Sequence, residues 1–574
     1  MNHKTIKRHE ANYLPTPKNL HPKLWEIFAH RQISNPEDLN YGLTELADYT
    51  KLKDIHLAAR RIVEAIEQEQ KILFVGDYDA DGATSCALGL LALKAMGASN
   101  IDFIVPNRFE FGYGLSPEIV RVAAAQQPHL LITVDNGIAS VDGVKEANAL
   151  GIDVVITDHH LPAETLPDAV AIVNPNQLGD EFPSKALAGV GVIFYVMIAV
   201  RAELRARQWF ARPGSTDVNM AKFLDLVALG TIADVVPLDK NNRILVENGL
   251  RRIRANACRP GIKALIDISK RNQPALAASD LGFALGPRIN AAGRLDDIQI
   301  GIECLLTESW KTAESLAEIL DDINTERKTI ENQMKSEADK HLAQLSMEIS
   351  IEDVYGIALY QPDWHQGVVG ILASRIKERF HVPTIIFAEI DEERLKGSGR
   401  SIEGFHLRDA LEAIYLKHPE LIDVFGGHAM AAGLTIQKQH FKAFALAFNE
   451  MVSARLNQQK IHACVMSDGE LDEHVMNVDF AHLLKCAGPW GQSFPEPTFD
   501  DYFNVVDRRV LQGKHLKLQV VKKKGQQVFD AILFNAPQDI LNQALDKVRL
   551  AYRLDVNEFM GRRTVQLLIE YIES

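Results

Sequence analysis

Short apolar runs alternate with helix-like stretches in the first part of this 574-residue chain. The runs occupy residues 72–75, 101–105, 130–134 and 154–157, and residues 83–96 form one of the helix-like stretches. Continuous apolar runs of this length are typical of strands that are buried on both faces, as in parallel sheets. The alternation therefore predicts a doubly wound α/β sheet.

Acidic side chains and imidazoles follow three of these predicted strands. In chain order they are Asp77, Asp79, Asp81, Asp135, Asp158, His159 and His160. Ligands of open α/β sheets bind outside the carboxyl ends of the strands, so these groups are expected at one edge of one sheet. Because so many like charges would repel one another, bound divalent cations are the natural solution.

The ligand types indicate which metal this site would hold. Oxygen-rich ligands with one or two imidazoles suit Mn²⁺ or Mg²⁺ better than zinc or copper. Two such ions about 4 Å apart can hold a nucleophilic hydroxide and polarise a phosphate. Asp234 lies within an apolar run, where an unpaired carboxylate is costly, and is predicted to be a further acid of this site. The alternative is that these acids are only turn residues and helix caps. This alternative is less favourable because acids or imidazoles follow three strands of one predicted sheet.

Several later segments suit phosphate or nucleic acid. Residues 286–294 and 397–401 combine turn residues with arginines, which offer bidentate donors to phosphate oxygens. Residues 425–433 read as a glycine-rich turn into a small-residue helix, whose backbone N–H groups could cradle an anion. Trp364 could stack on a base, although core filling is the alternative. The candidate contacts are Arg288, Asn290, Arg294, Trp364, His365, Ser398, Arg400, Ser401, Gly426, Gly427 and His428.

The length predicts three or four domains. Residues 308–346 contain no Gly or Pro and have amphipathic periodicity, which predicts one long helix serving as a spacer between lobes. Strand-like runs broken by turns near the C-terminus predict a small β-barrel of the OB type. The expected organisation is an N-terminal arm with helices at 1–65, a first α/β lobe at 66–307, the connecting helix, a second α/β lobe at 347–455 and the barrel at 456–574.

Composition excludes several classes of protein. No apolar run reaches the roughly 20 residues of a membrane helix, and the polar N-terminus lacks a signal-peptide segment, so a cytoplasmic protein is expected. The five cysteines include no CxxC pair, which argues against a zinc ribbon or a redox motif. The net charge of −14 argues mildly against a generic nucleic-acid coat protein but leaves room for a local basic groove.

The motifs resemble those of DHH phosphoesterases. Residues 77–82, 134–137, 158–160 and 230–234 resemble the four motifs of that superfamily, and residues 426–428 resemble the signature of its DHH-associated second domain. The resemblance implies that the first lobe is a DHH domain and the second a DHH-associated domain.

Residues 286–290 and 364–370 resemble, more narrowly, bacterial exonucleases that are specific for single-stranded DNA. This resemblance covers roughly residues 50–574, including the barrel. It implies hydrolysis from the 5′ end to mononucleotides with Mn²⁺ or Mg²⁺, through attack of a hydroxide held on a di-metal centre. It also implies roles in recombination, repair and mismatch repair alongside a single-strand-binding protein and a helicase. A monomer is expected, with no membrane partner.

The resemblance also assigns roles to residues. It implies metal ligation by Asp79, Asp81, Asp135, His159 and Asp234, an orienting role for Asp158, and phosphate contacts by His160, Arg288, Arg400 and His428. The chain departs from the pattern at Val75, where many DHH proteins have a histidine, so either Asp77 takes over as a ligand or one ion is held more weakly. In the barrel, Lys514, His515 and residues 522–524 are candidate strand contacts, with a solvated charged turn as the alternative.

Two rival functions remain open from the sequence. One is a DHH phosphodiesterase that acts on dinucleotides or short RNA, against which the extra barrel argues. The other is a non-catalytic scaffold that binds a single strand, against which the complete set of acids argues.

Overall fold

The computed structural model describes residues 4–10, 15–106, 114–212, 216–348, 354–459, 461–559 and 561–573. The chain forms two compact units. The larger unit consists of His9–Asn324 and Asp468–Glu570, and the smaller unit of Met1–Arg8, Thr325–Ser467 and Tyr571–Ser574. Among the described residues, no helix combines the length and the apolar character that crossing a membrane requires.

A five-stranded parallel sheet forms the centre of the N-terminal part of the larger unit. In spatial order its strands are β3 (Ile101–Ile104), β2 (Ile72–Gly76), β4 (Leu130–Val134), β5 (Asp153–Thr157) and β6 (Ala171–Val173). The chain leaves β2 toward β3 on one side and then continues on the other side with β4. The strand order therefore reverses between β2 and β4, and ligands of doubly wound sheets bind at such a switch point.

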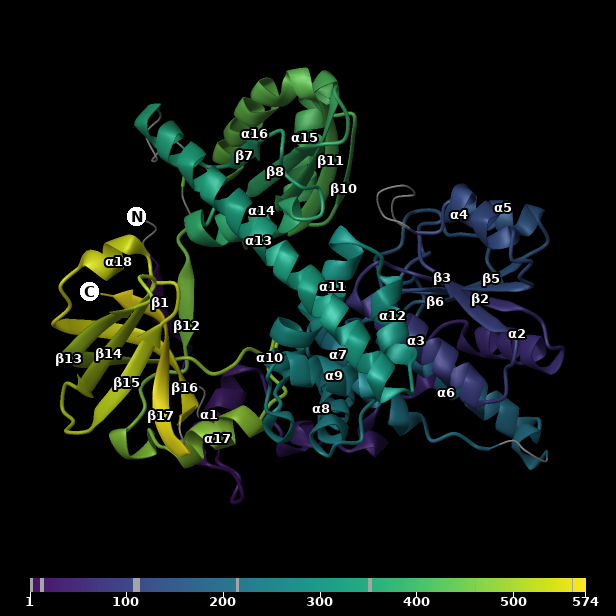
Figure 1. Cartoon of the computed structure of the whole chain (residues 1–574), viewed down its shortest axis with the longest axis horizontal. Helices are drawn as coiled ribbons and strands as arrows, with labels where there is room; N and C mark the ends of the chain where they lie inside the picture. Colours follow the sequence, from purple (N-terminus) through teal and green to yellow (C-terminus); the bar gives the residue numbers. More distant parts are fainter. Residues whose placement is uncertain are drawn as a thin grey trace. The chain divides into compact units, whose positions relative to one another are not determined.

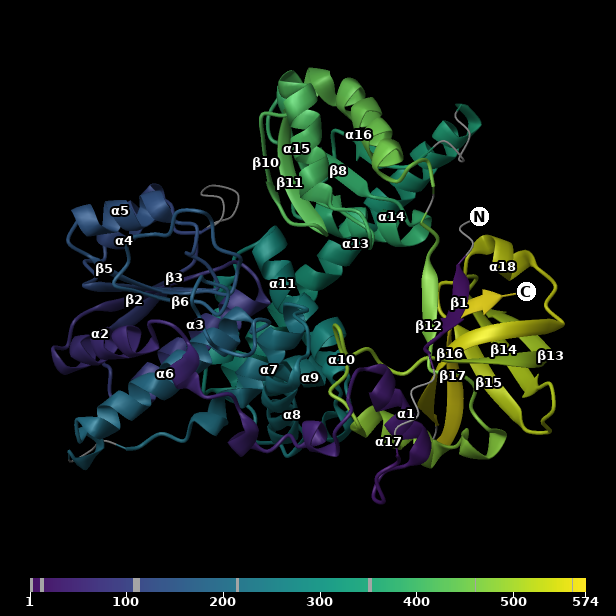
Figure 2. The same ribbon diagram turned by 180° about the vertical axis from the view of Figure 1, so that it is seen from behind.

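Helices cover both faces of this sheet (Figures 1 and 2). They are α4 (Pro117–Ala124) and α5 (Val141–Ala149) on one face, and α2 (Ile55–Glu67), α3 (Ala80–Ala95) and α6 (Gly189–Ala206) on the other. Successive side chains of β2 point to opposite faces of the sheet. Leu73 and Val75 belong to the core under α4 and α5, whereas Phe74 packs on Gly89 of α3. The doubly wound α/β prediction is confirmed.

More helices complete the N-terminal part of the larger unit. They are α1 (Pro22–His30), α7 (Leu224–Ala233), α8 (Lys240–Arg254), α9 (Pro260–Ile268), α10 (Ala278–Asp280), α11 (Gly286–Leu295) and α12 (Gln299–Leu306). A π-helical turn, Leu281–Leu285, joins α10 to α11. Helix α7 packs on α3 and α8, which brings its C-terminal end to the sheet edge where the acids lie.

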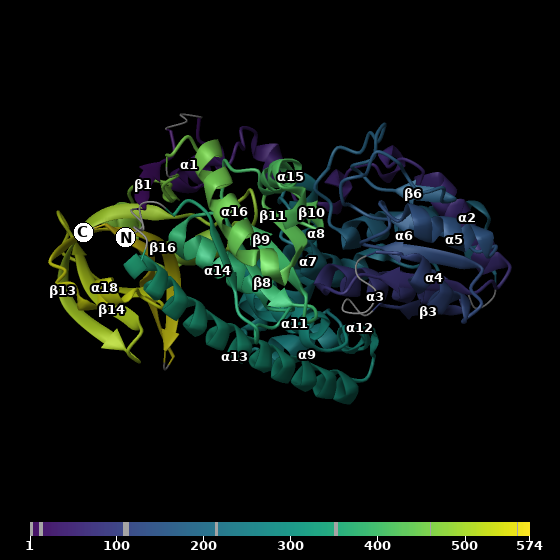
Figure 3. The same cartoon turned by 90° about the horizontal axis from the view of Figure 1, so that it is seen from above.

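The predicted long helix is α13 (Trp310–Glu348), a single uninterrupted helix (Figure 3). Helix α13 belongs to both units, which divide between Asn324 and Thr325, and part of its charged face makes contacts. Within the smaller unit, Glu331 Oε1 lies 3.0 Å from Arg375 Nε, and Glu337 accepts a hydrogen bond of 2.9 Å from Trp364 Nε1.

The smaller unit contains a mixed five-stranded sheet in the order β10-β11-β9-β8-β7. Its elements are β7 (Ile357–Tyr360), α14 (Val369–Phe380), β8 (Thr384–Glu389), β9 (Arg394–Arg400), α15 (Leu407–Lys417), β10 (Val424–Gly427), β11 (Ala431–Gln437) and α16 (Phe441–Arg455). Phe387, Phe444 and Phe448 lie in its core. Strand β1 (Thr5–Arg8) pairs in parallel with β12 (Cys464–Ser467).

The prediction of a glycine-rich turn into a helix at residues 425–433 was wrong. This segment forms the β10–β11 hairpin, which turns near Gly427 at φ +135°. Ala431–Gln437 pairs with β9, and a Cβ at Gly399 of β9 would lie 3.4 Å from the Ala432 carbonyl oxygen. Small residues face one another across these two strands, and that long-range pairing decides the structure.

The C-terminal part of the larger unit is a closed five-stranded barrel, which confirms the OB-type prediction. Its elements are α17 (Val478–Cys486), β13 (Phe499–Leu511), β14 (His515–Lys522), β15 (Val528–Leu533), α18 (Gln538–Asn542), β16 (Lys547–Phe559) and β17 (Arg562–Glu573). The segment before β13 packs on α1, where the rings of Phe28 and Trp490 stack with centroids 5.7 Å apart.

Candidate metal centre

The switch point of the parallel sheet brings the predicted acids together. Asp77 and Asp79 follow β2, and Asp135 follows β4 directly. Asp79 is the N-cap of α3, and its Oδ1 accepts backbone hydrogen bonds from Asp81 and Gly82 at 2.9 and 3.0 Å. Asp135 is buried and has φ +62°, a left-handed conformation that Asp tolerates better than most residues.

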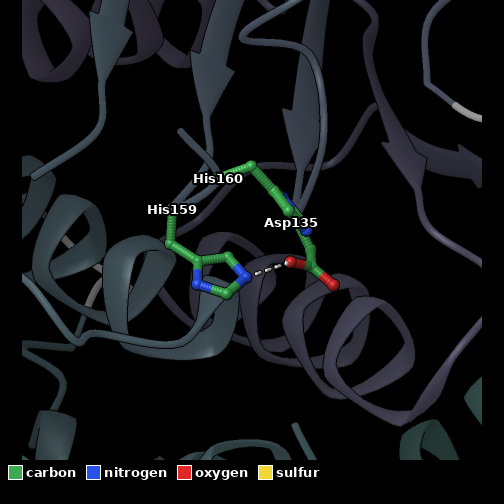
Figure 4. A group of neighbouring side chains, drawn as sticks. All are labelled: Asp135, His159 and His160. Atoms are coloured by element: carbon green, nitrogen blue, oxygen red, sulfur yellow. Dashed lines mark ion pairs between the residues drawn. The ribbon is translucent and has the colours of Figure 1, made fainter. Parts of the chain in front are cut away.

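His159 stands opposite Asp135 (Figure 4). Its Nε2 lies 3.0 Å from Asp135 Oδ1 and 3.5 Å from Asp234 Oδ2. Burial, reinforced by the neighbouring His160, lowers the pKa of His159 to about 4, so the ring is neutral at pH 7. The Leu187 backbone bonds to the ring and raises this pKa, which identifies it as the acceptor of a ring N–H.

This arrangement fits a bound cation. A neutral imidazole that donates through one nitrogen presents a lone pair at the other, and here that nitrogen faces two carboxylate oxygens. Burial, followed by the negative charges of Asp81 and Asp79, raises the pKa of both Asp135 and Asp234 well above the ordinary value. A divalent cation among these groups would reverse that effect, because it favours the charged carboxylates.

Among the residues that the structure describes, three groups of side chains have ligand atoms within 4.8 Å of one another. The groups are Asp135 with His159 and His160, Asp81 with His159 and Asp234, and Asp77 with Asp79 and Asp135. Asp135 and His159 each belong to two groups, and the Asp135 carboxylate has two oxygens with which it could contact two neighbouring ions. Val75 is buried in β2 and offers no ligand atom, whereas Asp77 belongs to one of the groups.

His160 and Asp158 form a pair at the rim of this centre. His160 Nδ1 lies 2.7 Å from Asp158 Oδ1, and 36% of the His160 side chain is exposed. Burial alone would raise the pKa of Asp158, but hydrogen bonds from His160 and from the Ile138 backbone hold it below its ordinary value. Asp158 thereby fixes the orientation of the His160 ring.

Asp81 has a geometry that the sequence did not indicate. Its two oxygens accept backbone hydrogen bonds from Gly189 at 2.6 Å and Val190 at 2.9 Å, in the first turn of α6. Burial and the charge of Asp79 raise its pKa to about 7, although these two hydrogen bonds lower it. Asp81 therefore ties α3 to α6 as well as standing among the candidate ligands.

Two glycines that the sequence reasoning missed allow this close packing. A Cβ at Gly189 would lie 2.6 Å from the Asp135 Cβ, and one at Gly230 would lie 2.3 Å from Thr84 Oγ1. Any larger residue would push α6 or α7 away from the acids. Only the resemblance of residues 230–234 to a family motif pointed to one of them.

Two of the predicted phosphate residues of α11 have contacts inside the larger unit. Asn290 Oδ1 accepts a hydrogen bond of 2.8 Å from the Ala80 backbone, at the start of α3. Arg288 is buried, with its Nη2 2.7 Å from Asp321 Oδ1 on α13. Arg294 lies half-buried in the last turn of α11. These contacts give Arg288 and Asn290 a structural role that the sequence did not reveal.

In the smaller unit, only some of the predicted phosphate-binding residues lie close together. Arg400 Nη1 donates to Ser398 Oγ at 3.3 Å, and burial lowers the pKa of Arg400. Both side chains lie beneath the first turn of α14, because a Cβ at Gly370 would be 3.0 Å from Arg400 Nη2 and from Ser398 Oγ. Arginine, hydroxyl and helix N-terminus form a combination that binds anions.

The remaining candidates of the smaller unit have structural contacts. Ser401 is buried and donates to the Phe405 carbonyl at 2.6 Å. Trp364 is 4% exposed, which leaves its ring no free face for stacking on a base. His365 Nδ1 accepts a hydrogen bond of 3.0 Å from the Gly367 backbone. Gly426 and Gly427 end β10, and the His428 backbone donates to Ala431 across the turn.

A doubly wound sheet with carboxylates and imidazoles at its switch point fits a metal-dependent hydrolase of the DHH class. Family models agree: residues 71–231 match the DHH family N-terminal domain, residues 353–454 the DHHA1 domain and residues 467–571 the RecJ OB domain. The single-stranded-DNA-specific exonuclease RecJ of Dickeya dadantii is 51% identical over 99% of this chain and 98% of that protein. This chain belongs to the RecJ family.

Solved structures of relatives agree with this assignment, and those relatives were crystallised with Mn²⁺ or Mg²⁺. RecJ from Thermus thermophilus in complex with Mn²⁺ superposes with a TM-score of 0.79 at 27% identity, over 96% of this chain and 76% of that one. The structure of the same relative with Mg²⁺ gives a TM-score of 0.73 at 26% identity, over 96% and 74%. The predicted cofactors, Mn²⁺ or Mg²⁺, fit the donor set found here.

Proposed function

We propose that this chain is a metal-dependent exonuclease that degrades single-stranded DNA from the 5′ end and releases mononucleotides. One observation carries the proposal: the convergence of Asp135, His159 and Asp234 at the switch point in a chain of the RecJ family. Bound Mn²⁺ or Mg²⁺ would supply Lewis-acid activation of water and of the scissile phosphate. Ions would be held by Asp77, Asp79, Asp135, His159 and Asp234, with Asp81 beside them.

The chain's own groups then position the phosphodiester. The His160 ring, oriented by Asp158, stands at the rim where it can donate a hydrogen bond to a phosphate oxygen. Burial lowers the pKa of His160, but the hydrogen bond and the charge of Asp158 raise it above its ordinary value overall. A cationic or hydrogen-bonding ring at this place stabilises negative charge that develops as the phosphodiester is attacked.

The terminal 5′ phosphate is assigned to the smaller unit. Ser398, Arg400 and the first turn of α14 present a hydroxyl, a guanidinium and backbone N–H groups together. A dianionic terminal phosphate gains more from such a site than an internal phosphodiester does, which would favour strands with a 5′ phosphate.

The barrel is assigned to the strand further from the cleaved end. Phe534 is 55% exposed and meets the His515 ring edge to face, with centroids 5.3 Å apart. Exposed rings beside lysines bind single strands by stacking and charge, so His515 and Lys514 remain candidate contacts. Lys522 does not fit this role, because its Nζ lies 2.6 Å from the buried Asp501.

In the cell, we propose roles in DNA recombination, repair and mismatch repair. There the enzyme would act on strands opened by a helicase and coated by a single-strand-binding protein. Neither rival function is favoured by an observation: the acids are complete, and residues 467–571 match the RecJ OB domain.

A direct assay tests the proposal. The purified protein with Mn²⁺ is given 5′-labelled and 3′-labelled single-stranded DNA, duplex DNA, single-stranded RNA and cyclic dinucleotides. Early release of labelled mononucleotide from the 5′-labelled single strand, and not from the 3′-labelled one, is expected. Absence of nucleotide release from single-stranded DNA would refute the proposal, and preferential cleavage of cyclic dinucleotides would favour the small-molecule alternative.

A further inference from the structure

Phe283 and Val235 are among the strongly exposed apolar side chains of the larger unit. The exposed fractions are 83% for Phe283 and 62% for Val235. Phe283 belongs to the π-helical turn Leu281–Leu285, in which Leu281 and Leu285 are themselves buried. The turn is therefore anchored in the core while the phenyl ring projects into solvent.

This turn packs on the C-terminal end of α7. A Cβ at Gly282 would lie 3.2 Å from Ile232 Cγ2, and a Cβ at Gly286 would lie 3.1 Å from the Ala233 Cβ. Asp234, whose carboxylate stands among the candidate metal ligands, follows Ala233 directly. The exposed ring is thus carried by a segment fastened to the residues that immediately precede an acid of the metal centre.

The backbone on both sides of this contact is unusual. Val235 has φ +62°, and a β-branched residue in the left-handed region is a steric outlier. Such strain persists only where the surrounding structure imposes it, and it collects at functional sites. Single π-helical turns are likewise frequent at functional sites. The backbone segments that expose Phe283 and Val235 therefore both have features that are frequent at functional sites.

We propose that Phe283, together with Val235, contacts a nucleobase of the substrate strand beside the scissile phosphate. The inference rests on the proposed function. A phosphodiester held among the acids would have its neighbouring sugar and base close to Asp234, and the segment packed on residues 232 and 233 carries an exposed aromatic ring. Stacking on a ring accepts every base, because each base has a π-face, and this suits an enzyme that degrades strands of any sequence.

The size of the exposed feature favours a base over a protein partner. A stable protein interface buries roughly 800 Å² on each partner. A phenylalanine side chain supplies only about 150–250 Å². One ring with one valine matches the face of a nucleobase far better than it matches an interface.

An abasic-site scan tests the inference. The full-length protein with Mn²⁺ is given 5′-phosphorylated single strands, each with one abasic site at a successive position from the cleaved end. For intact strands, Phe283→Ala should raise KM about tenfold with little change in kcat, given the usual strength of base stacking. In the wild-type protein, an abasic site at the contacted position should raise KM by a similar factor, and at that position Phe283→Ala should add nothing further.

Controls separate stacking from other effects. Phe283→Trp keeps a ring and should retain the wild-type KM. Leu150→Ala removes a 49% exposed apolar side chain that precedes β5, at the sheet edge opposite the acids, and should leave KM unchanged. Thermal unfolding and Mn²⁺ binding should be the same in Phe283→Ala and in the wild-type protein, because the ring lies outside the core.

Two results would overturn the inference while leaving the proposed function intact: an unchanged KM in Phe283→Ala, or an effect of this variant that adds fully to the effect of an abasic site at every position. A wild-type protein that does not cleave single-stranded DNA would overturn the proposed function and this inference together.

Discussion

At the scale of single residues, Asp135 concentrates the chemistry of the centre. It is buried, it follows β4 directly, and it belongs to two of the three candidate ligand groups. Asp135→Ala should abolish cleavage, with a loss larger than the roughly 10–100-fold that removal of an outer-shell partner of a metal site causes. Binding of single-stranded DNA, measured by fluorescence anisotropy, should stay within about twofold, because phosphate and base contacts dominate such binding.

Asp135→Asn is the matched variant, because Asn tolerates the left-handed conformation at this position better than Ala does. Asp102→Ala removes an acid from β3 that lies in none of the ligand groups, and it should keep full activity. Retained turnover in both variants of Asp135 would contradict a metal centre at this switch point.

Asp81 permits a second test at the residue scale. Asn at this position keeps one acceptor for the α6 backbone but turns an NH₂ group toward the other N–H, either of Gly189 or of Val190. Leaving one buried N–H unsatisfied should lower the free energy of unfolding by about 1–3 kcal/mol. Denaturant unfolding of Asp81→Asn measures this loss, and calorimetric titration with Mn²⁺ should give the wild-type number of ions. If Asp81→Asn is as stable as the wild-type protein but binds one ion fewer, Asp81 acts only as a metal ligand.

At the scale of elements, strands and helices with local signals were predictable and long-range pairings were not. Residues 72–75 predict β2 (Ile72–Gly76), and residues 308–346 predict α13 (Trp310–Glu348) to within two residues at each end. The β10–β11 hairpin escaped prediction because its small residues are selected by β9, far away in the sequence. Trp364 looked available for stacking because its partner Glu337 lies on another element.

The attachment of α1 predicts a dependence of stability on pH. Asp468, at the start of the C-terminal segment, lies 2.8 Å from His30 Nδ1 and 2.9 Å from Arg31 Nη1 at the end of α1. Burial alone would raise the pKa of Asp468, but these hydrogen bonds and charges lower it from 3.8 to about 2. A carboxyl with a lowered folded-state pKa contributes stability above its unfolded pKa, and that contribution is lost as the pH falls.

The free energy of unfolding should therefore drop by about 2 kcal/mol between pH 4 and pH 2 through this group alone. Urea unfolding followed by tryptophan fluorescence measures it, since Trp490 and Trp25 lie buried in this region. Asp468→Asn should be less stable than the wild-type protein at pH 7 and should lack this part of the pH dependence. Parallel pH profiles of the two proteins would show that Asp468 does not contribute.

At the scale of the whole molecule, the strand-end rule predicted most of the metal centre. Parallel strands deliver Asp77, Asp79, Asp135 and His159 to one edge whatever the details of packing, so position along the sequence was sufficient. Residue type alone did not reveal the structural contacts of the candidate phosphate residues. Arg288 has the right chemistry, but its guanidinium pairs with Asp321 of α13, a partner that only the folded chain reveals.

The concentration of acids in the larger unit predicts which part of the molecule a bound metal ion stabilises. The acids of the larger unit raise one another's pKa, so a divalent cation should stabilise that unit, and the smaller unit offers no comparable group among its described residues. Mn²⁺ at 100 times its Kd should stabilise the folded state by about 2.7 kcal/mol per site, and EDTA should remove the effect. Hydrogen exchange should locate it: amides of α3, α6 and α7 should gain protection, whereas those of α15 and α16 should not. Equal protection of both units, or a gain that persists in Asp135→Asn, would contradict a metal centre confined to the switch point.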